Sequence, residues 1–259
     1  MSTKPNHPYH LVNPSPWPLF ASIVAGMMLG GTVLYMHTDS YWLMVLGFLG
    51  LLFSMIVWWK DVIHEAFVEK AHTPVVKMGL RYGILLFITS EVMFFVAFFW
   101  AFFNSSINPV GGMWPPEGIQ TFNPFELPLM MTLVLLLSGT TVTWAHEALR
   151  ESKIKDATLA LWLTVGLGVF FTLIQLYEYS HAHFGFDEGI FPSTFFMATG
   201  FHGFHVLIGT IFLAVCLFRN KAGHFTAKDH FGFEAAAWYW HFVDVVWLFL
   251  FVWVYWWGS

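Results

Sequence analysis

The chain has 259 residues, of which 57% are hydrophobic, 20% are aromatic and only 10% are charged. Soluble domains carry roughly 25% charged residues, so this composition excludes an ordinary water-soluble domain and indicates a protein immersed in lipid. The formal net charge of -5 provides no basic surface for nucleic acid, and the single cysteine, Cys216, excludes an internal disulfide and a Cys-x-x-C metal site.

Apolar stretches long enough to cross a bilayer recur along the whole sequence. A hydrocarbon core about 30 Å thick needs roughly twenty residues per helix, and backbone groups that meet no water must bond within the segment, which leaves helices as the only option. We therefore predict an all-α membrane protein, a single seven-helix membrane domain covering residues 1–259. The predicted helices span residues 16–36, 41–59, 78–103, 127–146, 157–179, 193–218 and 234–257.

The first predicted helix contains Gly26 and Gly30, a small-xxx-small pair that predicts a close helix approach. The second ends in Trp58 and Trp59, where indole rings can bridge hydrocarbon and headgroups. Residues 60–77 then form a predicted inner connection, and residues 104–126 form the longest predicted loop, because their Gly and Pro residues break helices.

All eleven Lys and Arg residues lie before the first predicted helix, in alternate connections or, for Arg81, in the first turn after such a connection. Basic loops stay on the side from which a protein is inserted, so the N-terminus is predicted to be inside and the C-terminus outside. The residues are Lys4; Lys60, Lys70, Lys77 and Arg81; Arg150, Lys153 and Lys155; and Arg219, Lys221 and Lys228.

Glu91 lies near the middle of the third predicted helix, about 15 Å into the membrane at a rise of about 1.5 Å per residue. An ionised carboxylate at that depth is costly, and such residues often mark proton or ion paths. A neutral Glu that bonds a neighbouring helix explains the residue equally well. Both interpretations remain open from the sequence.

The last two predicted helices carry further polar groups. His202 and His205 share one helix face, and His241 and Asp244 share another, after Glu234 opens the final helix. Neutral imidazole is a good ligand for iron, copper and zinc, but no second Cys or Glu-x-x-His set on these two helices completes a site. We therefore predict no metal site and expect these five side chains to form hydrogen bonds between helices.

Two groups near helix ends are expected to face headgroups or water. Glu178, His181 and His183 lie at the outer end of the fifth helix, and His146 and Glu147 close the fourth helix on the inner side. At the inner connection, cations beside Trp58 and Trp59 can hold anionic lipid headgroups. The general inner bias of positive charge explains those cations as well.

Long ordered strings connect these features to a known family. The chain resembles subunit III of cytochrome c oxidase, a haem-copper oxidase, over essentially its whole length. The matching strings are HLVNPSPWP at 10–18, HTP at 72–74 with GLRYG at 79–83, SEVMFF at 90–95, WPP at 114–116, TWAH at 143–146, ATGFHG at 198–203 with His205, and GFE at 232–234 leading into AWYWHFVDVVW at 237–247.

The resemblance implies a non-catalytic core subunit of an aa3-type oxidase. The whole complex reduces dioxygen to water with electrons from cytochrome c and pumps protons. Haem a, haem a3 and copper belong to subunits I and II, and this chain is expected to hold no redox cofactor. It would pack beside subunit I, stabilise it and support proton uptake, with Glu91 matching the buried carboxylate on the family's third helix.

The resemblance also implies a V-shaped bundle of two helices and five helices whose cleft binds phospholipids. Lys60 and His64 stand where some relatives have Arg, which weakens a fixed bidentate contact with phosphate. The expected headgroup ligands are Trp58, Trp59, Lys60, Glu65 and His72 on one side and Arg219 and His224 on the other.

Two alternatives are weighed beside this hypothesis. A proton-coupled transporter could use Glu91 as its carrier carboxylate, although no internal repeat supports it. Subunit III of a quinol oxidase is closer, but those relatives commonly lack the first two helices. The expected location is the mitochondrial inner membrane or the bacterial cytoplasmic membrane, because both impose the same physics.

Overall fold

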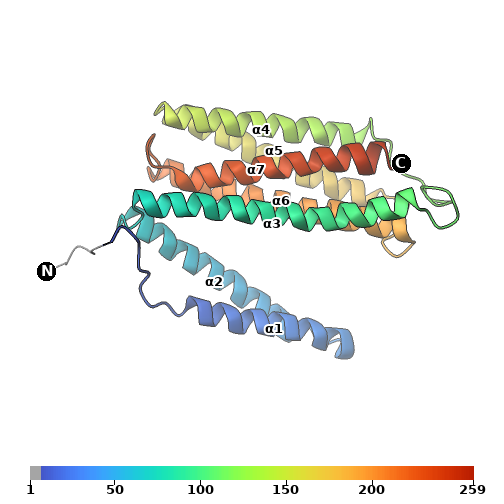
Figure 1. Cartoon of the computed structure of the whole chain (residues 1–259), viewed down its shortest axis with the longest axis horizontal. Coiled ribbons are helices and arrows are strands. Elements are labelled where there is room, and N and C mark those ends of the chain that lie inside the picture. Colours follow the sequence, from blue (N-terminus) through green and yellow to red (C-terminus); the bar gives the residue numbers. More distant parts are fainter. Residues whose placement is uncertain (1–6) are drawn as a thin grey trace. The chain divides into compact units, whose positions relative to one another are not determined.

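The computed structural model describes residues 7–259, so Lys4 lies outside the described residues. Within that range the chain forms seven α-helices and no strand, and each helix is long and apolar enough to cross a membrane (Figure 1). The prediction of an all-α protein with seven spans is confirmed. The helices are α1 Trp17–Thr38, α2 Trp42–Phe67, α3 Pro74–Ile107, α4 Leu127–Arg150, α5 Ile154–Ser180, α6 Ile190–Lys221 and α7 Phe231–Leu250, which continues as the π-helix η1 Phe251–Trp256.

Most helices are longer than the predicted spans. The predicted inner connection at 60–77 was wrong, because α2 continues to Phe67 and α3 begins at Pro74. An apolar run marks only the part of a helix that lies in hydrocarbon. The helix itself can continue into the headgroup region with its charged side chains in water. Proline suits the first turn of a helix, where its missing N–H has no partner to lose. Similarly, α3 runs to Ile107 and shortens the predicted outer loop.

The chain divides into two compact units, Met1–Leu80 and Arg81–Ser259, hereafter unit 1 and unit 2. The V-shaped arrangement implied by the resemblance stays a prediction. In unit 1, α1 and α2 pack against each other over their length. Trp17 at the start of α1 donates its indole N–H to Asp61 near the end of α2, at 2.6 Å. Because this contact joins the N-terminal end of α1 to the C-terminal end of α2, the two helices are antiparallel.

Glycines set how closely α1 and α2 approach. A Cβ atom at Gly31 would overlap the backbone of Met44, and one at Gly47 would overlap the backbone of Met28. Gly26 and Gly30, whose spacing could allow a close helix approach, do not make this one, because a Cβ atom at either would have no atom of another segment within 4 Å. Sequence spacing identifies small residues on one face but not the face that meets the partner.

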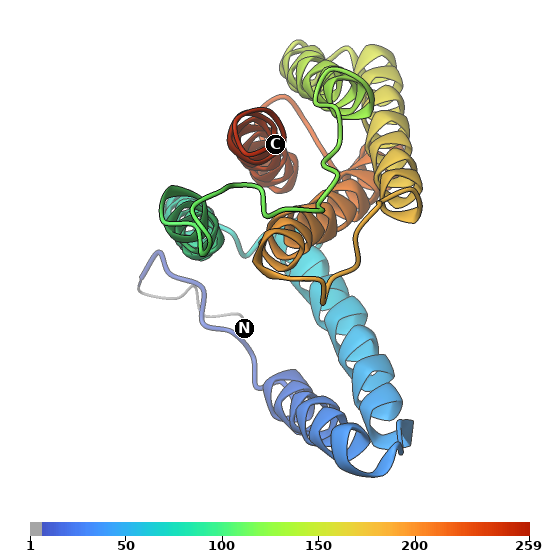
Figure 2. The ribbon, with the colours of Figure 1, turned by 90° about the vertical axis from the view of Figure 1, so that its right-hand side faces the viewer.

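Unit 2 contains the hydrophobic core. Helices α4, α5, α6 and α7 contact one another in a closed order, α4 with α5, α5 with α6, α6 with α7 and α7 with α4, as seen end-on in Figure 2. Trp240 and Trp247 of α7 are fully buried at the centre of this bundle. Their indole N–H groups donate to Ser138 and Thr132 of α4, each at 2.9 Å. The largest core side chains are therefore hydrogen-bonded as well as packed.

Candidate functional site

Glu91 and His205 form the central polar contact of unit 2. Glu91 Oε2 on α3 lies 2.7 Å from His205 Nε2 on α6, and the two side chains are 23% and 8% exposed. Aromatic rings enclose the imidazole, among them those of Phe95 and Tyr239. The sequence identified both residues but not their pairing, because they are separated by more than a hundred positions.

A hydrogen bond to the backbone fixes how many protons this pair holds. His205 Nδ1 lies 2.6 Å from the carbonyl oxygen of Phe201, which can only accept a hydrogen bond, so Nδ1 carries a proton. One further proton must then lie between Nε2 and the Glu91 carboxylate. The pair is either a neutral acid with a neutral imidazole or a carboxylate with an imidazolium. In both forms its net charge is zero, which suits its position within the span.

His202, one turn before His205, is fully buried. Its Nε2 lies 3.2 Å from the carbonyl oxygen of Val243, so it donates a hydrogen bond from α6 to α7. Its Nδ1 is buried without a hydrogen-bond partner among residues 7–259. This arrangement fits an interhelical contact and gives His202 only one satisfied nitrogen.

His241 and Asp244 connect α7 to α4. His241 Nδ1 lies 3.6 Å from Asp244 Oδ2, and its Nε2 lies 3.2 Å from the hydroxyl of Thr143. That hydroxyl already donates to the carbonyl of Gly139, so the imidazole must donate to it. A Cβ atom at Gly139 would overlap the carboxylate of Asp244, so the glycine allows this close approach.

Glu234 at the start of α7 binds Arg81 of α3. Arg81 donates from Nη2 to Oε2 at 2.9 Å and from Nε to both oxygens at 3.1 and 3.2 Å. At the same end of unit 2, His146 Nε2 of α4 lies 3.2 Å from His230 Nε2, just before α7. Thus His146 contacts another helix end, whereas Glu147 is exposed and binds Arg150 at 3.0 Å.

The expected headgroup ligands lie in both units. In unit 1, Trp58 and Trp59 are 38% and 60% exposed and Lys60 is exposed, whereas Glu65 and His72 are half-buried. In unit 2, the guanidinium of Arg219 lies over the ring of Phe225, 4.5 Å from its centroid, and His224 is half-buried nearby in sequence. Arg219 Nε is buried without a hydrogen-bond partner in the described range.

Glu178 corrects an expectation from the sequence. It does not face headgroups or water, because its side chain is fully buried and Tyr255 of η1 donates a hydrogen bond to its Oε2 at 2.7 Å. His181, in contrast, is exposed. Its sequence position places Glu178 near the end of a helix but does not indicate which segment covers the helix face that carries it. The partner, Tyr255, lies in the π-helix that continues α7.

Sequence reasoning also missed a group of possible metal ligands in unit 1. His10, Glu65 and His72 each offer one donor atom, and the three atoms lie within 4.8 Å of one another. Glu65 and His72 were predicted as headgroup ligands, but His10 lies far away in sequence, in the segment before α1. Only the folded chain brings it to the other two.

Comparison with known proteins identifies relatives of the whole chain. Residues 7–259 match the family model described as cytochrome c oxidase subunit III. The chain is 57% identical over 256 residues to cytochrome c oxidase subunit 3 of Danio rerio, which covers 98% of both chains. It is 55% identical over 260 residues to the corresponding protein of Mus musculus, covering 99% of this chain and all of the relative.

Proposed function

Because the chain belongs to the cytochrome c oxidase subunit III family, we propose that it acts as the non-catalytic core subunit of an aa3-type oxidase. It is a multi-pass inner-membrane protein and a core part of the oxidase complex. In the proposed role it packs beside subunit I, stabilises it and supports proton uptake, with its N-terminus inside. The partner subunits I and II hold haem a, haem a3 and copper, and subunit II receives electrons from cytochrome c.

The pairing of Glu91 with His205 carries this proposal. The intramembrane acid is bonded to a neighbouring helix of the same unit at 2.7 Å, and His202 and Trp247 likewise bond groups on adjacent helices. Polar side chains engaged in this way stabilise a bundle. The family match includes α1 and α2, which favours a cytochrome c oxidase subunit over the quinol-oxidase alternative.

Removal of the chain from the purified oxidase tests the proposed role. The depleted complex should keep its haem spectrum and its initial rate of oxygen consumption, take up protons more slowly and lose activity over repeated turnovers. The isolated chain should show no haem absorbance. Loss of haem in proportion to loss of the chain would contradict the proposal, and so would an unchanged rate of proton uptake with sustained activity.

Phospholipid binding is the second part of the proposed role. In unit 1, the indoles of Trp58 and Trp59 accompany Lys60, and Glu65 and His72 add a carboxylate and an imidazole for headgroup ammonium or hydroxyl groups. In unit 2, the half-buried guanidinium of Arg219, which lies over the ring of Phe225, is the cation offered to a phosphate oxygen, and His224 follows it in sequence. Each unit thus offers a cation to an anionic headgroup.

Charge removal at the two cations tests lipid binding. Lys60→Gln and Arg219→Gln should each lower the phospholipid phosphorus that co-purifies with the assembled complex. Lys153→Gln is the matched control, because Lys153 is exposed and already binds Glu151 at 2.6 Å. Equal phosphorus in all three variants and the unmodified complex would contradict headgroup binding at these positions.

A further inference from the structure

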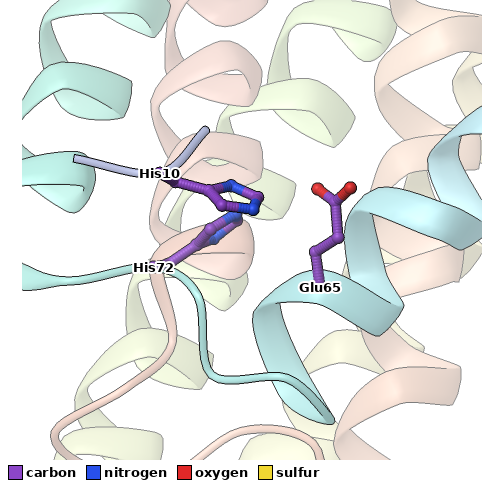
Figure 3. Close-up of side chains that lie close together, drawn as sticks. All are labelled: His10, Glu65 and His72. Atoms are coloured by element: carbon purple, nitrogen blue, oxygen red, sulfur yellow. The ribbon is translucent and has the colours of Figure 1, made fainter. Parts of the chain in front are cut away.

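We propose that His10, Glu65 and His72 form a binding site for a divalent transition-metal ion such as zinc. The three side chains come from three segments of unit 1: the stretch before α1, the last turns of α2 and the connection between α2 and α3. Figure 3 shows both imidazoles and the Glu65 carboxylate directed toward a common space.

The donor types indicate which ion the site takes. Two imidazole nitrogens and one carboxylate oxygen suit zinc, which is commonly held by three protein ligands and a water molecule. Calcium and magnesium prefer oxygen ligands throughout, and no cysteine lies in unit 1 to favour a thiolate site.

The distances are compatible with coordination after small movements. Tetrahedral zinc with bonds of about 2.0 to 2.1 Å places its ligand atoms roughly 3.4 Å apart, and the three donors here lie within 4.8 Å of one another. The rings of His10 and His72 have centroids 6.0 Å apart at an interplanar angle of 60°, so they do not stack face to face. Changes of rotamer in these partly buried side chains can close the difference.

The backbone holds the three segments together before an ion binds. Ala71 donates its N–H to the carbonyl oxygen of Glu65 at 3.0 Å, which keeps the residue before His72 against the last turn of α2. Lys70 adopts a positive φ of 51°, which reverses the chain there. The hydroxyl of Thr73 donates to the carbonyl oxygen of Pro8 at 2.6 Å and anchors the segment that carries His10.

Space for a fourth ligand lies beside one of the donors, His10. A hollow of about 350 Å³ is lined by His10 and Thr73 and also by His7 and Lys70. Water can enter it and complete the coordination of zinc. A phosphate oxygen could take the same position, so zinc at Glu65 and His72 does not exclude the headgroup binding proposed above. The bound ion would fix the segment before α1 to the end of α2.

Zinc loading of the intact oxidase tests the site. The purified complex is stripped with a chelator, desalted, given one equivalent of zinc chloride and desalted again, and retained zinc is measured by mass spectrometry. His10→Ala, Glu65→Gln and His72→Ala should each lower retained zinc by about one ion per complex at neutral pH. His64→Ala is the matched control, because this exposed histidine precedes Glu65 and pairs with Glu69 at 3.4 Å.

Two results would overturn the proposal: equal zinc retention in the three variants and the unmodified complex, or an equal loss in the His64→Ala control. X-ray absorption at the zinc edge on the unmodified complex keeps the test valid if a variant fails to assemble. We expect two imidazole nitrogens and additional oxygen ligands, and a first shell without imidazole would refute the site. Retention should also fall as the pH is lowered, because protons compete with zinc for imidazole nitrogens.

Discussion

At the scale of single residues, Glu91 and His205 share one proton because Phe201 already accepts a hydrogen bond from His205 Nδ1. In Glu91→Gln the amide N–H can donate to His205 Nε2, so the helix contact persists. The complex should assemble normally, and proton uptake should change only modestly. In Glu91→Leu the buried imidazole loses its partner, which should destabilise the subunit by about 1–3 kcal/mol.

Proton uptake and retention of the chain on warming measure these two effects. Met93→Leu is a suitable control because Met93 is exposed on the same helix. If Glu91→Gln failed to assemble, the carboxyl group itself would be required, and the interpretation of a simple interhelical hydrogen bond would be wrong.

Glu178 and Tyr255 give a second prediction at residue scale. Tyr255→Phe removes the hydroxyl that donates to the buried Glu178 carboxyl group, while the ring and its packing remain. An unsatisfied buried acceptor costs about 1–3 kcal/mol, so the chain should dissociate from the complex at a lower temperature. Tyr177→Phe on α5 should have no effect, since Tyr177 is 57% exposed. Equal thermal profiles for the two variants would contradict the proposed cost.

Residue types in the spans could be identified from the sequence, but their partners could not. Glu91, His205 and Asp244 stand out because charge and imidazole are rare in hydrocarbon. The number of residues between Glu178 and Tyr255 gives no information about their contact. Tyr255 lies in the π-helix at the end of α7, an irregularity that hydropathy does not predict.

At the scale of helices, Gly168 determines how closely α5 packs in unit 2. A Cβ atom there would lie 2.5 Å from Thr210 Oγ1 of α6 and 2.8 Å from the Trp240 ring of α7. Gly168→Ala should therefore push these helices apart and destabilise the bundle by about 1–3 kcal/mol.

Gly166→Ala, two residues earlier on α5, is the matched control, because its Cβ atom would have no atom of another segment within 4 Å. Resistance of the chain to release by detergent and heat compares the two variants. A Gly166→Ala variant that was as unstable as Gly168→Ala would show that loss of glycine flexibility, and not packing, determines the effect.

Helix identity was predictable because each span needs about twenty apolar residues, but helix ends were less so. The tail of α2 from Lys60 to Phe67 remains helical although Lys60, Asp61 and Glu65 are charged. Charged side chains are expected to lie outside the hydrocarbon, while the hydrogen bonds of the helix backbone continue to Phe67. Likewise, Gly26 and Gly30 have the spacing for a close contact, yet Gly31 and Gly47 lie against the partner helix.

At the scale of the whole molecule, the distribution of Lys and Arg predicts the orientation in the membrane. Cysteines introduced in turn at Val110 and Lys153 should react with a membrane-impermeant maleimide from opposite sides, Val110→Cys from outside and Lys153→Cys from inside. Both positions are exposed, and the native Cys216 is buried, so background labelling should be low. Labelling of both from one side would contradict the predicted topology.

The short distance between Glu91 and His205 makes their proton insensitive to voltage. A proton exchanged between Oε2 and Nε2 moves less than the 2.7 Å that separates these atoms. Moving a unit charge through a full potential of 100 mV is worth about 2.3 kcal/mol, and this displacement covers less than roughly a tenth of the hydrocarbon, or about 0.2 kcal/mol. The shared proton should therefore keep the same position between Glu91 and His205 whether the membrane is energised or depolarised.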